Sequence, residues 1–218
     1  MRYAKALGLA FVAMLALSAV AATAASADDF TAEKYPATLT GTNDPGFSDE
    51  FLTTIGTFKC TKTTYTATVV GPTTSLTATP SFSGCAAFGF PFVFDMNGCT
   101  FKFNIGAGTT GDADLVCPAG AELTITATSA GTAKCTEHIK AQSDIAGMVT
   151  YSNIGAGTTR EITISAALSG IDYTHTAGTG IGQCTSGSAA NGILNAKAIF
   201  TGENDGPVFT EHVGVFLS

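Results

Sequence analysis

The 218-residue chain contains no tryptophan and few charges, since only 12% of its residues are Asp, Glu, Lys or Arg. Ten basic residues stand against 17 acidic ones, so the basic excess that nucleic-acid binding requires is missing, and we expect no nucleic-acid partner. The same balance argues against binding to anionic membranes. Without Trp, and with only five Tyr, few aromatic side chains are available to stack against sugar rings.

Sequence motifs of catalysis and metal binding are also missing. The chain has no Cys-x-x-Cys pair, which argues against a redox or zinc centre. It has neither the Gly-x-Ser-x-Gly motif of serine hydrolases nor the His-Glu-x-x-His motif of zinc proteases. We therefore expect no catalytic residue, no cofactor and no metal ion, and the expected protein is not an enzyme.

The first 27 residues have the three parts of an export signal. Arg2 and Lys5 supply positive charge, residues 7–20 are apolar, and Ala25-Ser26-Ala27 provides the small residues of a cleavage site. We expect a signal-peptide helix at 1–27 and a mature domain at 28–218 that is secreted and extracellular, either released or held at the cell surface without a covalent link. No later apolar run is long enough to span a membrane, so we expect no membrane span after signal removal.

Alternation of apolar and polar residues recurs along residues 28–218, between turns rich in Gly, Asn and Asp. A period of two places successive side chains on opposite faces of a strand. The pattern predicts about a dozen short strands in an all-β, antiparallel β-sandwich, or in two packed small β units. The expected inward-facing residues are Tyr65, Ala67, Val69, Leu123, Ile125, Ala127, Ala133, Cys135, Ile139, Ile162, Ile164, Ala166, Leu168, Leu194, Ala196, Ala198 and Phe200.

Asn97-Gly98 lies between two alternating runs and predicts a β-hairpin with a type I′ turn. The expected strands are 92–96 and 99–103, with Phe94 opposite Phe101. This pairing places one set of residues on a common buried face: Phe92, Phe94, Met96, Cys99, Phe101 and Phe103.

All six cysteines follow residue 27, and in an oxidising compartment we expect them to form structural disulfides. The preferred pairing is Cys60–Cys85, Cys99–Cys117 and Cys135–Cys184. A second expected hairpin supports it, because pairing of Phe103 with Ala113 places Cys99 opposite Cys117. The alternative keeps Cys60–Cys85 and joins Cys117 to Cys135 and Cys99 to Cys184.

A seven-residue segment, Asn-Ile-Gly-Ala-Gly-Thr-Thr, occurs at 104–110 and again at 153–159. It raises the hypothesis of an internal duplication with a boundary near 120–131; the alternative is a favourable loop that arose twice. We expect the least order at 28–35 and in the Gly/Ser-rich stretch 177–192, and a turn at 203–206.

Isolated polar residues give weak indications of a site. The three histidines, His138, His175 and His212, lack the partners of a known motif, and Ser186 is expected to be an ordinary loop serine. Asp172 and His175 are expected on opposite faces of one strand. Asp112-x-Asp114 and the turn at 203–206 offer oxygen ligands for calcium, but turns commonly contain Asp and Asn, and we favour that interpretation.

Threonine alternates along three expected strands, at 64–68, 77–79 and 124–128. If these strands are neighbours, their threonines form ladders similar to the faces of some ice-binding proteins. We favour the simpler interpretation that Thr is the solvent-side residue of an exported strand.

Two motifs, Asp-Met-Asn-Gly-Cys at 95–99 and Val-Cys-Pro-Ala-Gly at 116–120, stand behind an Ala-rich leader. In these features the chain resembles a family of small secreted, cysteine-containing β proteins from high-GC Gram-positive soil bacteria. The resemblance implies export, β structure and disulfides, and it implies no activity, ligand or catalytic residue.

Together these patterns predict a secreted, non-catalytic binding or structural protein of the cell envelope or extracellular space. Its expected partner is a cell-wall or extracellular polymer, or another envelope protein. The alternative is a secreted hydrolase with carboxylates drawn from distant parts of the chain. A deep pocket with two carboxylates, or His175 beside a serine, would favour the hydrolase.

Overall fold

The computed structural model describes residues 28–218 except 88, 130–131, 179–183, 185 and 206–209, so the expected signal-peptide helix lies outside the described residues. The strands are β1 (Phe30–Ala32), β2 (Ala37–Asn43), β3 (Asp49–Thr53), β4 (Gly56–Val69), β5 (Ser75–Ala87), β6 (Phe90–Asp95), β7 (Thr100–Ile105), β8 (Thr110–Val116), β9 (Leu123–Ser129), β10 (Thr132–Ile139), β11 (Gln142–Ile154), β12 (Glu161–Ala177), β13 (Gly187–Asp205), β14 (Thr210–Val213) and β15 (Val215–Leu217). A short 3-10 helix, η1, spans Gly157–Thr159. The predicted all-β, antiparallel fold is confirmed.

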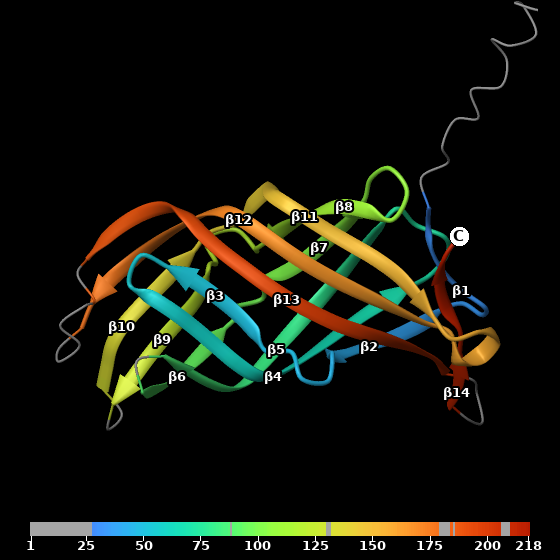
Figure 1. Cartoon of the computed structure of the whole chain (residues 1–218), viewed down its shortest axis with the longest axis horizontal. Helices are drawn as coiled ribbons and strands as arrows, with labels where there is room; N and C mark the ends of the chain where they lie inside the picture. Colours follow the sequence, from blue (N-terminus) through green and yellow to red (C-terminus); the bar gives the residue numbers. More distant parts are fainter. Residues whose placement is uncertain (1–27, 88, 130–131, 179–183, 185, 206–209) are drawn as a thin grey trace, which may run out of the picture.

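Thirteen strands form one antiparallel sheet that closes on itself. Four long strands, β4, β5, β12 and β13, run along its whole length. Between them lie four positions of the sheet, each occupied by two shorter consecutive strands placed end to end: β2 with β3, β6 with β7, β8 with β9, and β10 with β11. We call each of these positions, and each of the four long strands, a lane of the sheet. The chain therefore passes up and down through eight lanes, and the last lane, β13, pairs with the first. Figure 1 shows the long strands crossing the molecule from end to end.

The lanes are interrupted or kinked near the middle of the molecule, a zone that we call the waist. In β4 and in β12 the alternation of buried and exposed residues shifts by one position. Cys60 and Thr63 of β4 are both buried although they are three residues apart, and the same holds for Leu168 and Ile171 of β12. Gly170 has a φ of 71° at the β12 irregularity, a backbone conformation that a residue without Cβ adopts at little cost. The short strands of each shared lane end and restart at the same level. The waist thus leaves room for loops that project from the outer surface.

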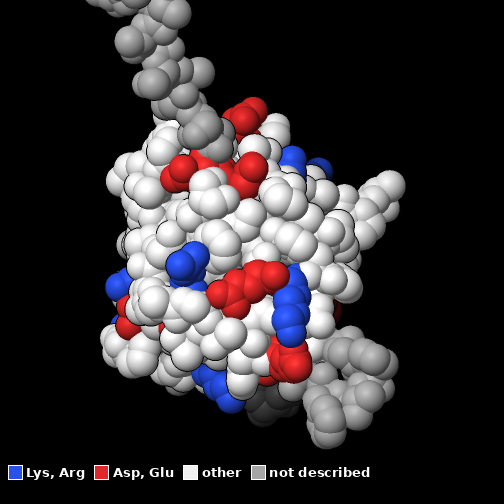
Figure 2. Space-filling model, turned by 90° about the vertical axis from the view of Figure 1, so that its right-hand side faces the viewer, with Lys and Arg blue, Asp and Glu red and all other residues white. Residues whose placement is uncertain are grey.

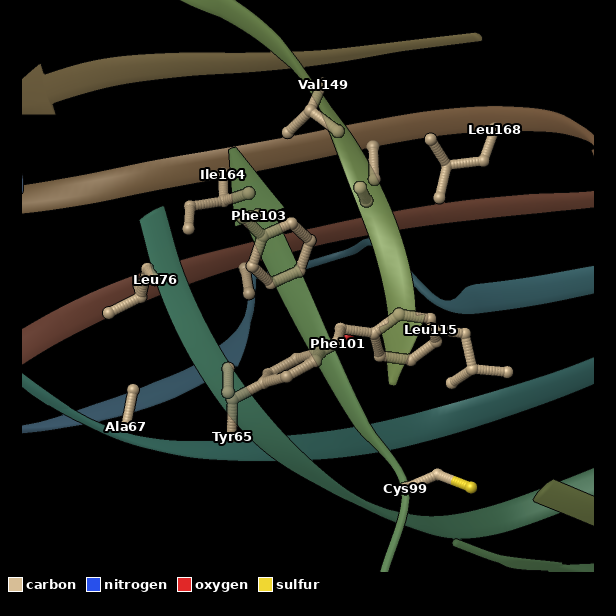
Figure 3. Packing of buried hydrophobic residues seen from close by; sticks show 14 of the residues in the cluster. Tyr65, Ala67, Leu76, Cys99, Phe101, Phe103, Leu115, Val149, Ile164 and Leu168 are labelled. Atoms are coloured by element: carbon tan, nitrogen blue, oxygen red, sulfur yellow. The ribbon is translucent and has the colours of Figure 1, made fainter. Parts of the chain in front are cut away.

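The core fills the inside of the closed sheet with the inward half of each alternating strand. Figure 3 shows Tyr65 of β4, Phe101 and Phe103 of β7, and Leu115 of β8 among the side chains that fill this interior. Phe30 of β1 is fully buried at one end, where its ring meets Tyr151 edge to face at 5.4 Å. The two-stranded β1–β15 sheet therefore covers this end of the core.

Inward-facing residues follow the sequence prediction closely. Among the predicted residues whose side chains are described, all are buried except Leu194 and Ala196, which are partly buried and pack against the core. Asp172 and His175 do lie on opposite faces of β12, with Asp172 exposed and His175 buried. Ala133 lies outside the described side chains.

The predicted hairpin at 92–103 is wrong in its pairing but correct in its face. Asn97 and Gly98 form a tight turn, closed by a 2.7 Å hydrogen bond from Cys99 N to Met96 O. However, β6 pairs with β5 and β9, and β7 pairs with β5 and β8. β6 and β7 pair with different parts of the same edge of the long strand β5. This pairing with a distant strand outweighs the preference of the Asn97-Gly98 turn to pair β6 with β7. The six residues of the predicted face still point inward or pack against the core.

Three other expectations need correction. The stretch 28–35 contains β1, which the buried Phe30 anchors, so it is not uniformly loose. The stretch 177–192 is partly strand, because β13 begins at Gly187 and pairs with β12 from Gly187 to Phe200; residues 179–183 and 185 lie outside the described residues. Of the turn expected at 203–206, residues 203–205 belong to β13, and residue 206 lies outside the described residues. In all three places, strand pairing with a distant segment orders residues whose composition suggests a loop.

Candidate functional site

A groove of about 560 Å³ opens on the outer surface at the waist, where the lane of β2 and β3 is interrupted. The β2–β3 loop forms one wall, and the outer faces of β11, β12 and β13 form the floor. Its lining residues are Gly46, Phe47, Ser48, Glu50, Lys59, Met148, Thr150, Ser165, Ala166, Ala167, Asn195, Ala196 and Lys197. We call this feature the waist groove.

Strand register arranges the groove floor in two rows that run across the strands. In the first row Met148 lies opposite Ala167, Ala167 opposite Asn195, and Asn195 opposite Glu50, which in turn pairs with Lys59. This row crosses five strands, so it extends about 19 Å at the usual strand spacing. The second row contains Thr150, Ser165 and Lys197. The floor is therefore long, and it alternates small, apolar and hydrogen-bonding side chains.

Two exposed apolar side chains flank this floor. Phe47 in the β2–β3 loop has 37% of its surface exposed, and Met148 on β11 has 52% exposed. Small Ala167 lies next to Met148 across the strand pair and leaves the floor open. Large apolar side chains that stay exposed beside a groove are typical of binding surfaces.

The charges of the waist groove are neutralised within it. Lys59 Nζ lies 2.9 Å from Glu50 Oε1, and Lys197 Nζ lies 2.6 Å from Asp44 Oδ2. Each charged lining residue therefore has a partner of opposite sign. Such a site suits an uncharged ligand, because a charged one would have to compete with these ion pairs.

The predicted pair Asp112 and Asp114 is joined by Asp144, which the sequence did not indicate. Carboxylate oxygens of the three residues lie within 4.8 Å of one another, close enough to hold a cation such as Ca²⁺. Asn104 Nδ2 already donates to Asp112 at 2.7 Å and to Asp114 at 3.1 Å. Lys102 Nζ lies 4.0 Å from Asp114. These internal partners account for the cluster without a metal ion.

Each histidine lies near a glutamate, and the three pairs are separate. His138 Nδ1 is 2.5 Å from Glu122 Oε1, His175 Nδ1 is 3.9 Å from Glu137 Oε2, and His212 Nδ1 is 4.0 Å from Glu203 Oε1. His138 Nε2 also lies 3.4 Å from Thr176 Oγ1, which makes a carboxylate–imidazole–hydroxyl chain on the surface.

His175 makes no hydrogen bond to a described serine. Gly187 is its partner on β13, and Ser186 Oγ instead accepts a hydrogen bond from Ala177 N at 3.0 Å. The serine beside His175 that would favour a hydrolase is therefore not found among the described residues. The oxygen atoms at 203–206, the other candidate calcium ligands, are only partly described, and the described Glu203 Oε1 lies 4.0 Å from His212 Nδ1.

Glu137 is the functional candidate that sequence reasoning missed. It is fully buried on the inner face of β10, and burial raises its pKa from 4.5 to about 7, against a smaller lowering by Thr53. Ionisable groups with strongly shifted pKa values often belong to functional sites. The signal was present, because Glu137 lies between Cys135 and Ile139 in the alternation that predicts an inward face.

All six cysteines form disulfides, in the preferred pairing Cys60–Cys85, Cys99–Cys117 and Cys135–Cys184. The predicted register of Phe103 with Ala113 is also confirmed. Cys60, Cys99 and Cys135 are almost completely buried, so the cysteines act as cross-links of the core and not as reactive thiols.

The threonine ladders of β4 and β5 do lie side by side, and β2 extends them. Thr40 lies opposite Thr66, which lies opposite Thr79. The third ladder, on β9, pairs with β6 and β10 and is separate from the other two. The surface is polar and uncharged, but it forms no cavity with polar groups that converge on one point.

Charge elsewhere is mixed in sign. Figure 2 looks onto the end that contains the β1–β15 sheet and shows acidic and basic side chains next to one another on a mostly uncharged face. The described residues include no helix with the length and hydropathy of a membrane-spanning segment.

Comparison with protein-family models, curated proteins and solved structures gave no match for this chain.

Proposed function

We propose that this protein is a secreted, non-catalytic binding module, and that the waist groove binds its ligand. The observation on which the proposal depends is the row of groove residues that crosses five strands from Met148 to Lys59. Three disulfides are typical of proteins that work outside the reducing cytosol, which supports export and an extracellular ligand.

The chemistry of the groove favours an extended, uncharged polymer as this ligand. Its floor is about 19 Å long, which suits several units of a linear chain better than one small molecule. Phe47 and Met148 offer apolar contact, while Thr150, Ser165 and Asn195 offer hydrogen bonds to hydroxyl groups. A neutral polysaccharide of the cell wall or extracellular matrix combines both properties, since sugar rings have an apolar face and hydroxyl edges.

Co-sedimentation of the purified mature protein with insoluble cellulose and chitin, and with pectate as an anionic comparison, tests this function. We expect binding to a neutral polysaccharide with little affinity for pectate. Phe47→Ala and Asn195→Ala should each weaken binding at least about tenfold, which corresponds to the loss of roughly 1.4 kcal/mol. The matched control is Val93→Ala, which removes an exposed apolar side chain outside the groove.

Two results would contradict the proposal. One is the absence of binding to any of the three polymers. The other is an equal loss of binding in Val93→Ala and Phe47→Ala, since the groove would then not be the site.

The alternative, a secreted hydrolase, is favoured by one observation. The chain Glu122–His138–Thr176 has the order of a carboxylate, a base and a hydroxyl nucleophile, and it borders an outer groove of about 370 Å³. However, β10 and β12 pair with each other here, so their backbone N–H groups serve the sheet and not an oxyanion. Hydrolysis of p-nitrophenyl acetate that is abolished by His138→Ala would favour this alternative.

A further inference from the structure

Glu137 and His175 face each other across the seam between β10 and β12, at the end of the molecule opposite the β1–β15 sheet. This seam contains four residue pairs, from Cys135 with Ala177 to His138 with Thr174. The neighbouring seam between β11 and β12 contains eight. The β10–β12 seam is therefore half as long as its neighbour, and its centre is a pair of ionisable side chains.

Both side chains are buried and lack hydrogen bonds. Glu137 has no exposed surface, and His175 has 8%. Glu137 Oε2 and His175 Nδ1 are 3.9 Å apart, which is too long for a hydrogen bond. Neither carboxylate oxygen has a hydrogen-bond partner, and Nδ1 has none either. Buried polar atoms without partners are rare in folded proteins and costly when charged.

The surrounding elements supply no further charge. β9 places Ile125 opposite Glu137, and β13 places Gly187 opposite His175, where a Cβ would lie 3.0 Å from Nε2. Thr53, the last residue of β3, is the polar neighbour of Glu137, and its hydroxyl donates a hydrogen bond to Gly56 O at 3.4 Å. Tyr173 lies beside His175, with ring centroids 6.0 Å apart. Among the described side chains, His175 and Tyr173 are thus the titratable groups that face this site.

The charge of this site depends on the proton of Glu137. With that proton the carboxyl group is neutral; without it, an unsolvated negative charge remains in the core, with no hydrogen bond to either carboxylate oxygen. We propose that Glu137, which faces His175, is a proton-operated latch: its proton keeps the β10–β12 seam closed, and loss of the proton opens the seam.

The direction of the pH effect follows from the burial of Glu137. Its pKa is about 7 in the folded protein, against an ordinary value of 4.5, so the folded state binds the proton more tightly than the unfolded state. The closed seam is therefore favoured in acid and loses stability as pH rises from about 4.5 to about 7. Above that range the seam opens, and it presents unpaired edges of β10 and β12 to which another strand can add.

The Cys135–Cys184 disulfide makes this opening local. It joins the first residue pair of the seam to the connection between β12 and β13. When the four residue pairs separate, β10 remains tethered beside β12, so the seam can close again when pH falls.

Hydrogen exchange measured by mass spectrometry from pH 5 to pH 9, corrected for the intrinsic pH dependence of exchange, tests the latch. We expect peptides that cover 135–138 and 174–177 to lose at least about tenfold of their protection as pH rises to about 7, with a midpoint at about pH 6 and no further loss above about pH 7. Peptides of β7 and β8 should stay protected throughout. Glu137→Gln, which is neutral at every pH, should keep the seam protected up to pH 9. The matched control Glu122→Gln changes a partly exposed carboxylate next to His138 and should retain the wild-type midpoint.

Unchanged protection of the seam in the wild-type protein from pH 5 to pH 9 would overturn the latch, whatever the variants do. An identical midpoint in wild type and Glu137→Gln would also overturn it. If Glu137→Gln does not fold, Glu137→Leu provides the neutral side chain, and the wild-type profile decides the question alone.

Discussion

At the scale of single residues, two buried acids show how one side chain can depart from an otherwise apolar face. Asp49 is 3% exposed and accepts a 2.8 Å hydrogen bond from Tyr65. Burial raises the pKa of Asp49, and burial beside Asp49 raises the pKa of Tyr65 well above its usual value. Tyr65 therefore satisfies one oxygen of the Asp49 carboxylate, whereas neither oxygen of Glu137 has a hydrogen-bond partner.

A close approach of strands at Gly111 gives a prediction at the same scale. A Cβ at this position would lie 1.8 Å from the carbonyl oxygen of Asn104 and 3.1 Å from the Tyr151 ring. Gly111→Ala should therefore force β7, β8 and β11 apart and lower the free energy of unfolding by about 1–3 kcal/mol or more. Urea denaturation monitored by circular dichroism measures it.

The control for this change is Gly71→Ala, because nothing lies within 4 Å of the added Cβ there. That variant should be as stable as the wild type or slightly more so. Equal stability of the two variants would show that the strands at Gly111 adapt.

At the scale of elements, local preference and strand pairing give different answers. Asn97-Gly98 makes the turn that its residue types favour, yet β6 and β7 follow each other along β5 and do not pair. A type I′ turn closes a hairpin only if the flanking strands have no better partners. Here β5, β8 and β9 provide them, and the same inward face is kept.

The Cys99–Cys117 disulfide stabilises the β7–β8 hairpin at the waist, where both strands end. Replacing both cysteines by alanine should lower the free energy of unfolding by about 2–4 kcal/mol, because the unfolded chain gains freedom and the fully buried Cys99 leaves a void. Equilibrium denaturation under non-reducing conditions measures this loss. A change below about 0.5 kcal/mol would mean that the sheet alone fixes the hairpin.

At the scale of the whole molecule, closure of the sheet removes nearly all free strand edges. Each lane has neighbours on both sides, and the β1–β15 sheet covers one end of the core. The β10–β12 seam is one of several short pairings in this ring, with four residue pairs against two between β5 and β6. A stable closed sheet with an outer groove and internal disulfides fits a protein that works outside the cell.

We predict that the mature protein recovered from a culture medium begins at Asp28 and contains no free thiol. Cleavage after Ala27 removes Arg2 and Lys5 from the ten basic residues, which leaves eight against 17 acidic ones. N-terminal analysis and intact mass with thiol-specific alkylation test both points. Retention of the first 27 residues, or alkylation of any cysteine without prior reduction, would contradict the prediction.

The sequence by itself determined the strand class and the inward faces, and it favoured the observed disulfide pairing over one alternative. These depend on period-two alternation, which is a local property of the chain, and on cysteines that the alternation places on those faces. Tertiary structure alone decided which strands pair, because β5 satisfies two consecutive strands that the turn between them would have paired with each other. It also decided the waist groove and the Glu137–His175 contact, since both bring together residues that lie far apart along the chain. These residues become neighbours only when the sheet closes, and closure depends on all eight lanes together.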